Sequence, residues 1–191
     1  MAGKRKALKI FSVLVIIGVL LFAFLLLVPQ MEKVTGFETL NSEGKSGKIL
    51  VVYNPGLSSF QKDVTLSFVN GLVERDYIVD ITTPSSETTT ETNGYDLIVL
   101  GAPTYGFSPA KPMENYVKKF GDFKGKKIVV LITGSGSTDE SEAKMKELIE
   151  NANGTIIESL TLWSLAPNEE IYGISDPSEI AYKSALNLKI S

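Results

Sequence analysis

The chain has 191 residues, a mass of 20.8 kDa and no Cys or His residue. This composition excludes disulfides, zinc sites with thiolate or imidazole ligands, and any catalytic triad or proton shuttle that uses histidine. The net charge is −3, but the first 30 residues hold four bases and no acid, which leaves the remainder at −7. An acidic remainder argues against nucleic acid as a partner, since nucleic-acid-binding surfaces are basic.

The first predicted element is an apolar helix over residues 10–28, which contain no charged residue. A helix of this length spans about 28 Å, close to the thickness of the hydrocarbon core of a bilayer. We therefore expect a short basic cytoplasmic tail over 1–9, a single transmembrane helix over 10–28 and a domain on the extracytoplasmic side. The alternatives are a cleaved signal peptide, although no small-residue cleavage site follows the run, and a buried core helix.

Two later segments are predicted to be irregular. Residues 29–47 contain Gly, Ser and mixed charge without an apolar period, which is typical of a linker. Residues 82–92 are rich in Thr and Ser, and they are predicted to form a solvated surface loop.

From residue 48 onward, short apolar segments alternate with amphipathic ones. The apolar segments are rich in β-branched residues and predict buried strands, whereas the amphipathic segments predict helices. Capping signals mark three of the helix starts, at Ser58 or Ser59, at Ser137–Glu140 and at Asp176–Pro177. The predicted strands cover residues 48–53, 77–81, 95–101, 126–133 and 155–163.

This alternation predicts a single α/β domain over residues 48–191, built on a doubly wound, five-stranded parallel sheet of order 2-1-3-4-5. Ligands of such sheets bind beyond the carboxyl ends of the strands, near the switch between strands 1 and 3. A binding site is therefore expected at the loops over 54–60, 102–111 and 134–138.

The loop after the third predicted strand has the most specific pattern, Gly101-Ala102-Pro103-Thr104-Tyr105-Gly106-Phe107. It resembles the flavodoxin family, whose third strand often runs into a G-[SA]-P-[TV]-Y-G segment that lies against the flavin ring of FMN. An aromatic face suits a flat conjugated ring, and a glycine allows the backbone to approach it. The alternative is a tight turn without a ligand. The resemblance implies flavin contacts from Pro103, Thr104, Tyr105, Gly106 and Phe107.

The loop after the first predicted strand matches the flavodoxin family less closely. The family holds the FMN phosphate there with hydroxyls, backbone N–H groups and a helix N-terminus. In this chain Pro55, Leu57 and Phe60 replace the usual Ser or Thr. Phosphate contacts are therefore expected from Gly56, Ser58 and Ser59. The alternative is a Pro-Gly turn followed by an N-cap.

The loop after the fourth predicted strand is rich in small residues and hydroxyls. Many flavodoxins place a ring-stacking Tyr in this region, and this chain has no aromatic there. The resemblance implies flavin contacts from Thr133, Gly134, Ser135 and Gly136. The alternative is a flexible turn between a strand and a helix.

The resemblance thus implies a membrane-anchored, flavodoxin-like protein that binds FMN and exchanges electrons with a redox partner protein or a quinone. One alternative is a membrane-tethered interaction or ligand-binding module that keeps the fold without flavin. Another is a quinone reductase that uses FMN or NAD(P)H. No metal site and no catalytic side chain are predicted.

Overall fold

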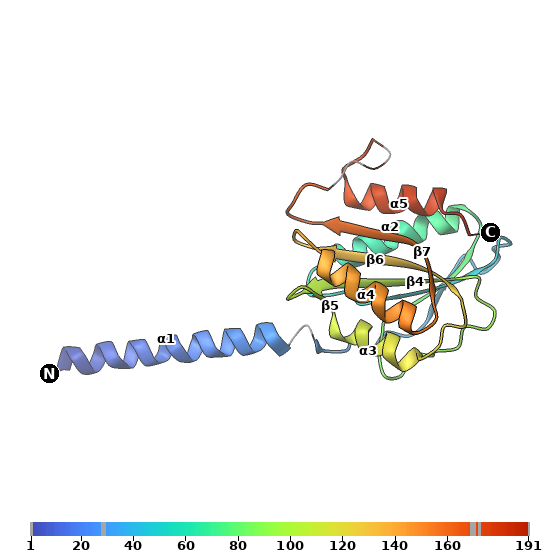
Figure 1. Cartoon of the computed structure of the whole chain (residues 1–191). Helices are drawn as coiled ribbons and strands as arrows, with labels where there is room; N and C mark the ends of the chain where they lie inside the picture. The colour runs from blue at the N-terminus through green and yellow to red at the C-terminus, as the bar shows by residue number, and fades with distance from the viewer. Residues whose placement is uncertain (1, 28–29, 169–170, 172, 191) are drawn as a thin grey trace.

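A computed structural model describes residues 2–27, 30–168, 171 and 173–190 (Figure 1). It contains five helices, α1 (Ala2–Leu27), α2 (Phe60–Glu74), α3 (Lys111–Phe120), α4 (Asp139–Asn151) and α5 (Pro177–Asn187). Its strands are β1 (Glu38–Leu40), β2 (Lys48–Tyr53), β3 (Ile78–Thr82), β4 (Leu97–Tyr105), β5 (Ser108–Pro109), β6 (Lys127–Gly134) and β7 (Thr155–Trp163).

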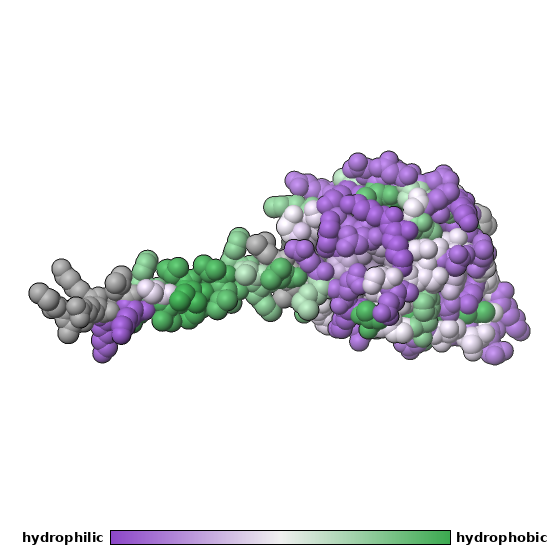
Figure 2. All heavy atoms as spheres, turned by 90° about the horizontal axis from the view of Figure 1, so that it is seen from below, coloured by the Kyte–Doolittle hydropathy of each residue, from purple (hydrophilic) through white to green (hydrophobic). Residues whose placement is uncertain are grey.

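Helix α1 corresponds to the apolar segment near the N-terminus (Figure 1). Its large apolar side chains from Ile10 to Phe24 are exposed (Figure 2). The last residue of the predicted span, Val28, and the first residue of the predicted linker, Pro29, lie outside the described residues. Within the described residues, no helix combines the length and the hydropathy that a membrane crossing requires. This finding overturns the predicted single-pass localisation, with its transmembrane helix over 10–28 and its extracytoplasmic domain.

The sheet runs in the order β1-β3-β2-β4-β6-β7, and β5 pairs with β4. Five strands pair in parallel, in the order β3, β2, β4, β6 and β7. In the middle of the sheet, Val99 of β4 lies between Val51 of β2 and Val129 of β6. These five are the predicted strands, and among themselves they stand in the order 2-1-3-4-5. The complete sheet differs from the predicted one because two further strands, β1 and β5, join it.

Strand β1 lies inside the segment that was predicted to be a linker, and it pairs antiparallel with β3. The hydroxyl of Thr39 donates a hydrogen bond of 2.6 Å to Asp80, a carboxylate that also receives the Tyr95 hydroxyl and pairs with Lys48. Residues 38–40 are thus part of the sheet. This strand could not be predicted, because three residues are too few to show an alternating pattern.

Helices cover both faces of the sheet, as Figure 1 shows. Helices α2 and α5 pack on one face, in a core that includes Val51, Phe68 and Ile180. Helices α3 and α4 pack on the other face, in a core that includes Leu50, Tyr116 and Met145. Since alternate residues of a strand point to opposite faces, strands covered on both sides are apolar throughout, which explains the apolar runs of the sequence.

The Thr- and Ser-rich segment over 82–92 is not the solvated loop that its composition predicted. Thr83, Ser85 and Thr88 are each at most 5 % exposed. Their hydroxyls are hydrogen-bonded, including a 2.9 Å contact between Ser85 and Thr88 and a 2.6 Å bond from Thr88 to the carbonyl of Thr83. Small hydroxyl side chains can be buried in a loop when they satisfy its backbone, which composition alone does not reveal.

Candidate functional site

A shallow hollow of about 120 Å³ lies at the carboxyl ends of β2, β4 and β6, the position at which the order of the strands reverses. Typical small-molecule pockets measure about 300–1,000 Å³, so this hollow would enclose only part of a cofactor. Among the residues predicted to bind flavin, those that line it are Gly56, Ser58, Pro103, Thr104, Tyr105, Thr133, Gly134 and Ser135. The predicted residues Ser59, Gly106, Phe107 and Gly136 do not line it.

Two backbone N–H groups of the loop between β2 and α2 already donate hydrogen bonds to other residues of the chain. The amide of Gly56 donates to Asn54 Oδ1 at 2.9 Å, and the amide of Leu57 donates to the Tyr105 hydroxyl at 2.8 Å. Ser59, at the N-cap of α2, makes no capping bond with its side chain. The donors left at this end of α2 are therefore the serine hydroxyls and the first helical amides, which have no partner within a helix.

Tyr105 connects two walls of the hollow. Its hydroxyl lies so close to Gly56 that a Cβ atom there would be 2.9 Å from the Tyr105 oxygen. Gly56 also has a φ of +71°, a conformation that glycine adopts readily. Burial raises the pKa of Tyr105, although the hydrogen bond from Leu57 opposes the shift, so the phenol stays protonated at neutral pH.

Residues 103–109 form a β-hairpin at the end of β4. Tyr105 pairs with Ser108 and Thr104 pairs with Pro109, so Gly106 and Phe107 form a two-residue turn. Both turn residues have positive φ angles, +52° and +63°. This geometry is that of a type I′ turn, which favours Asn or Gly and is strained for a phenylalanine. The Phe107 side chain is 67 % exposed.

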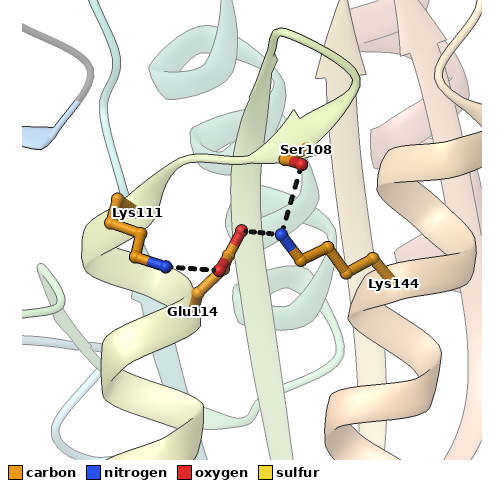
Figure 3. Close-up of polar contacts among 4 residues, drawn as sticks. All are labelled: Ser108, Lys111, Glu114 and Lys144. Atoms are coloured by element: carbon orange, nitrogen blue, oxygen red, sulfur yellow. Dashed lines mark hydrogen bonds and ion pairs between the residues drawn. The ribbon is translucent and has the colours of Figure 1, made fainter. Parts of the chain in front are cut away.

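An ion-pair cluster with a buried carboxylate lies beside this hairpin (Figure 3). Glu114 of α3 is 2 % exposed and pairs with Lys111 at 3.0 Å and with Lys144 of α4 at 2.7 Å. Burial by itself would raise the pKa of Glu114, but the hydrogen bonds from Lys144 and Lys111 outweigh it and hold the pKa below its ordinary value. The same Lys144 ammonium donates to Ser108 Oγ at 3.2 Å. No pattern in the sequence predicted this cluster.

The third wall is formed by the end of β6. The Thr133 hydroxyl donates to the buried side chain of Gln61 at 2.7 Å, which ties β6 to α2. The carbonyl of Gly134 accepts a bond from the Ser164 amide at 2.9 Å, and the carbonyl of Ser135 accepts from the Ala166 amide at 3.0 Å. This loop is therefore held by the segment after β7. Gln61 and Ser164 line the hollow and were not predicted, because neither belongs to a recognisable pattern.

The capping box predicted at Ser137–Glu140 does not form. Thr138 is the N-cap of α4, and its hydroxyl makes no capping bond. That hydroxyl instead accepts a hydrogen bond of 3.1 Å from the indole nitrogen of Trp163. By contrast, the cap predicted at Asp176 is confirmed, because its carboxylate accepts the amide of Glu179 at 2.8 Å.

Residues 31–35 lie against the outer side of the same loops. A second hollow, of about 210 Å³, is lined by Met31, Glu32 and Lys33 on one side and by 54–57 and Tyr105 on the other. Thr83 fixes this segment by accepting the Thr35 amide at 3.0 Å and by donating to the carbonyl of Lys33. Glu32 accepts the Ser86 amide at 3.1 Å. The segment after α1 is thus docked at the end of the sheet that carries the first hollow.

No family model and no curated protein matches the sequence. Solved structures do match. A flavodoxin from the domain Archaea is 16 % identical, with a TM-score of 0.58 over 73 % of this chain and 94 % of its own. An NAD(P)H:quinone oxidoreductase from Methanothermobacter marburgensis is 14 % identical, with a TM-score of 0.53 over 75 % of this chain and 97 % of its own.

An azoreductase from Bacillus anthracis is 12 % identical, with a TM-score of 0.55 over 74 % of this chain and all of its own. The sequence identities are low, so these likenesses concern the arrangement of the backbone. They agree with an α/β fold built on a parallel sheet. The chain has the flavodoxin-like fold that its Gly101–Phe107 segment resembled.

Proposed function

We propose that this chain binds FMN at the hollow formed by β2, β4 and β6 and carries electrons. The observation that carries the proposal is the convergence of three loops, one with an aromatic hairpin, at the switch point of a flavodoxin-like sheet. Proteins of this fold include flavodoxins and flavin-dependent reductases by name. The partner that we propose is a redox protein or a quinone.

The donor set at the hollow fits a flavin more closely than it fits a phosphate. The hydroxyl of Thr104 is buried without a hydrogen-bond partner among the described residues, and Thr104 lines the hollow. An unpaired buried polar group costs about 1–3 kcal/mol, which a polar ring edge would recover. For the phosphate, Ser58, Ser59 and the first amides of α2 are the donors left, since Gly56 and Leu57 already use theirs.

Bound FMN would supply the redox chemistry, because it accepts and releases one or two electrons. The chain's own residues would then bind and orient it. Tyr105 offers an aromatic face at the hollow, and Phe107 offers a second one at the exposed tip of the hairpin. The backbone of Thr133, Gly134 and Ser135 offers polar groups at the opposite wall. The phosphate end would lie at the N-terminus of α2, whose dipole favours negative charge.

The test is a titration of the full chain with FMN and with riboflavin, followed by quenching of flavin fluorescence. We expect FMN to bind with micromolar or tighter affinity, and we expect Tyr105→Ala to weaken binding at least about tenfold through loss of an aromatic contact. Tyr182→Ala is the matched control, because Tyr182 bonds to Glu74 at the far end of α2. A folded chain that quenches neither flavin would contradict the proposal.

The second candidate is a flavin-free interaction or ligand-binding module. The observation that favours it is the hydrogen bond from the Leu57 amide to Tyr105, which ties the loop to the hairpin and uses a donor that a phosphate would need. The same titration separates the two functions. Absence of quenching by the folded chain would favour the flavin-free module.

A further inference from the structure

The carboxylate of Glu114 does not line the hollow, but it is almost completely buried. Glu114 lies in the first turn of α3, directly after the hairpin, and is 2 % exposed. Its two oxygens are shared between two lysines, Oε2 with Lys111 at 3.0 Å and Oε1 with Lys144 at 2.7 Å (Figure 3). A charged group is rarely buried in this way unless it is paired.

Lys144 links this carboxylate to the hairpin. Its ammonium donates to Glu114 and also to Ser108 Oγ, at 3.2 Å, so that one side chain of α4 joins α3 and β5. Figure 3 shows the lysine between the two elements, with Ser108 above the carboxylate. The other side of the hairpin is closed by the Ala110 amide, which donates to the carbonyl of Pro103 at 2.9 Å.

The hairpin needs such support because its tip is strained. Phe107 has a φ of +63°, which costs a residue with a bulky side chain about 1–2 kcal/mol. Its ring is largely exposed, and a Cβ atom on Gly106 would meet no atom within 4 Å. Strained backbone persists where the surrounding structure holds it, and such strain gathers at functional sites.

We propose that Glu114 is a positioning residue of the flavin site: it holds Lys144 against Ser108 and so fixes the hairpin that presents Tyr105 and Phe107. The inference rests on the proposed function, because it concerns the wall that would contact the flavin ring. Without the carboxylate, the Lys144 ammonium would turn to solvent, since an ammonium is strongly hydrated. Ser108 would then lose its donor and the turn would be free to relax.

The test compares two lysines of α4. Lys144→Met removes the bond to the hairpin. Lys146 is a lysine of similar exposure, and Lys146→Met removes its ion pair with Glu142, at 2.6 Å, which does not involve the hairpin. Each variant of the full chain is titrated with FMN and riboflavin. We expect Lys144→Met to weaken both flavins alike, by about tenfold, because a charge-assisted bond is lost on the ring side. We expect Lys146→Met to change neither by more than about twofold.

Two further measurements separate positioning from a loss of general stability. Lys144→Arg retains a cation with several donors and should restore most of the affinity. The visible circular dichroism of bound flavin should change in Lys144→Met and in Glu114→Gln and stay unchanged in Lys146→Met. Equal effects of Lys144→Met and Lys146→Met on affinity and on the flavin spectrum, with tight binding by the unmodified chain, would overturn the inference and leave the proposed function intact.

Amide hydrogen exchange in the hairpin provides a readout that needs no flavin. The amides of residues 104–108 should exchange faster in Lys144→Met than in Lys146→Met, because local opening of the β4–β5 pairing becomes easier. If the unmodified chain binds no flavin, the proposed function fails, and this comparison still decides whether Glu114, Lys144 and Ser108 act as a brace of the hairpin. Equal exchange in the two variants would overturn the inference.

Discussion

The hairpin over 103–109 and the loop over 54–59 face the same hollow, but different contacts hold them. The hairpin is braced from outside, through Ser108, Lys144 and Glu114, and it leaves its aromatic tip exposed. The loop is held by its own amides, which donate to Asn54 within the loop and to the Tyr105 hydroxyl of the hairpin. The hairpin therefore keeps its aromatic faces free, whereas the loop uses two of its phosphate-binding donors for its own structure.

Removing both lysines that pair with Glu114 should lower the unfolding free energy more than any other change proposed for the site. In Lys111→Met/Lys144→Met the Glu114 carboxylate stays almost buried with neither of its ion-pair partners. Leaving a buried charge without its partner typically costs about 3–5 kcal/mol. Because the two lysines are half-exposed, we expect a loss of unfolding free energy at the lower end, about 3 kcal/mol. Urea denaturation measures it.

The matched control for this double variant is Lys146→Met, whose partner Glu142 is more exposed, at 22 %. Its expected cost is about 1 kcal/mol or less, as for other solvent-exposed pairs. If the double variant lost no more unfolding free energy than the control, the ion pairs of Glu114 would stabilise the chain no more than an exposed pair does.

The next largest effect probes the phosphate-side wall through Gly56. Its φ of +71° disfavours alanine, and a Cβ atom would lie 2.9 Å from the Tyr105 oxygen and 3.1 Å from Pro103 Cγ. We expect Gly56→Ala to lower the unfolding free energy by about 2–3 kcal/mol, the sum of a backbone cost and a steric cost.

Gly94→Ala separates these two costs. Gly94 has a φ of +87°, but a Cβ atom there would meet nothing within 4 Å, so only the backbone cost of about 1–2 kcal/mol applies. In a Tyr105→Phe background, Gly56→Ala should become less costly because the crowded oxygen is gone. Equal losses for the two glycines would show that Tyr105 does not clamp the loop.

The smallest effect is a difference in pH dependence. The Glu114 pKa in the folded chain lies below its ordinary value of 4.5, because the hydrogen bonds from Lys144 and Lys111 outweigh the opposing effect of burial. A depressed carboxyl pKa adds stability above 4.5, and this stability is lost as the pH falls through the folded value. Thermal unfolding from neutral to acid pH should therefore show a shallower loss of stability in Glu114→Gln than in the unmodified chain. Parallel curves would contradict this assignment.

The architecture of the sheet was predictable because buried parallel strands consist of nearly continuous apolar residues. Residues 48–53 and 155–163 are strands with the predicted bounds. Strand β4 was predicted to end at Gly101 but continues to Tyr105, so the family-like segment is itself part of the strand and its hairpin. Strands as short as β1 and β5 leave no periodic signal, and so the edge of the sheet and the turn at Gly106–Phe107 could not be predicted.

The residues of the candidate site were predictable only where they lie at or just after the carboxyl end of a predicted strand. Gly56 follows β2, and Thr104 and Gly134 lie at the ends of β4 and β6, so the topology brings the three together at one edge of the sheet. The Glu114–Lys144 pair joins residues that are 30 positions apart and lie on two different helices. Gln61 reaches Thr133 across 72 positions. Contacts of this kind depend on how helices pack over the sheet, which a single sequence does not contain.

The docking of residues 32–35 determines where the folded unit begins. Because Glu32 bonds to Ser86, Thr35 bonds to Thr83 and β1 pairs with β3, the segment before residue 48 supplies part of one side of the sheet. A shortened chain that starts at Lys48 would leave the edge of β3 unpaired, and an unpaired edge invites association with other chains. The shortest version that retains all these contacts starts no later than Glu32, sixteen residues before the first strand of the parallel sheet.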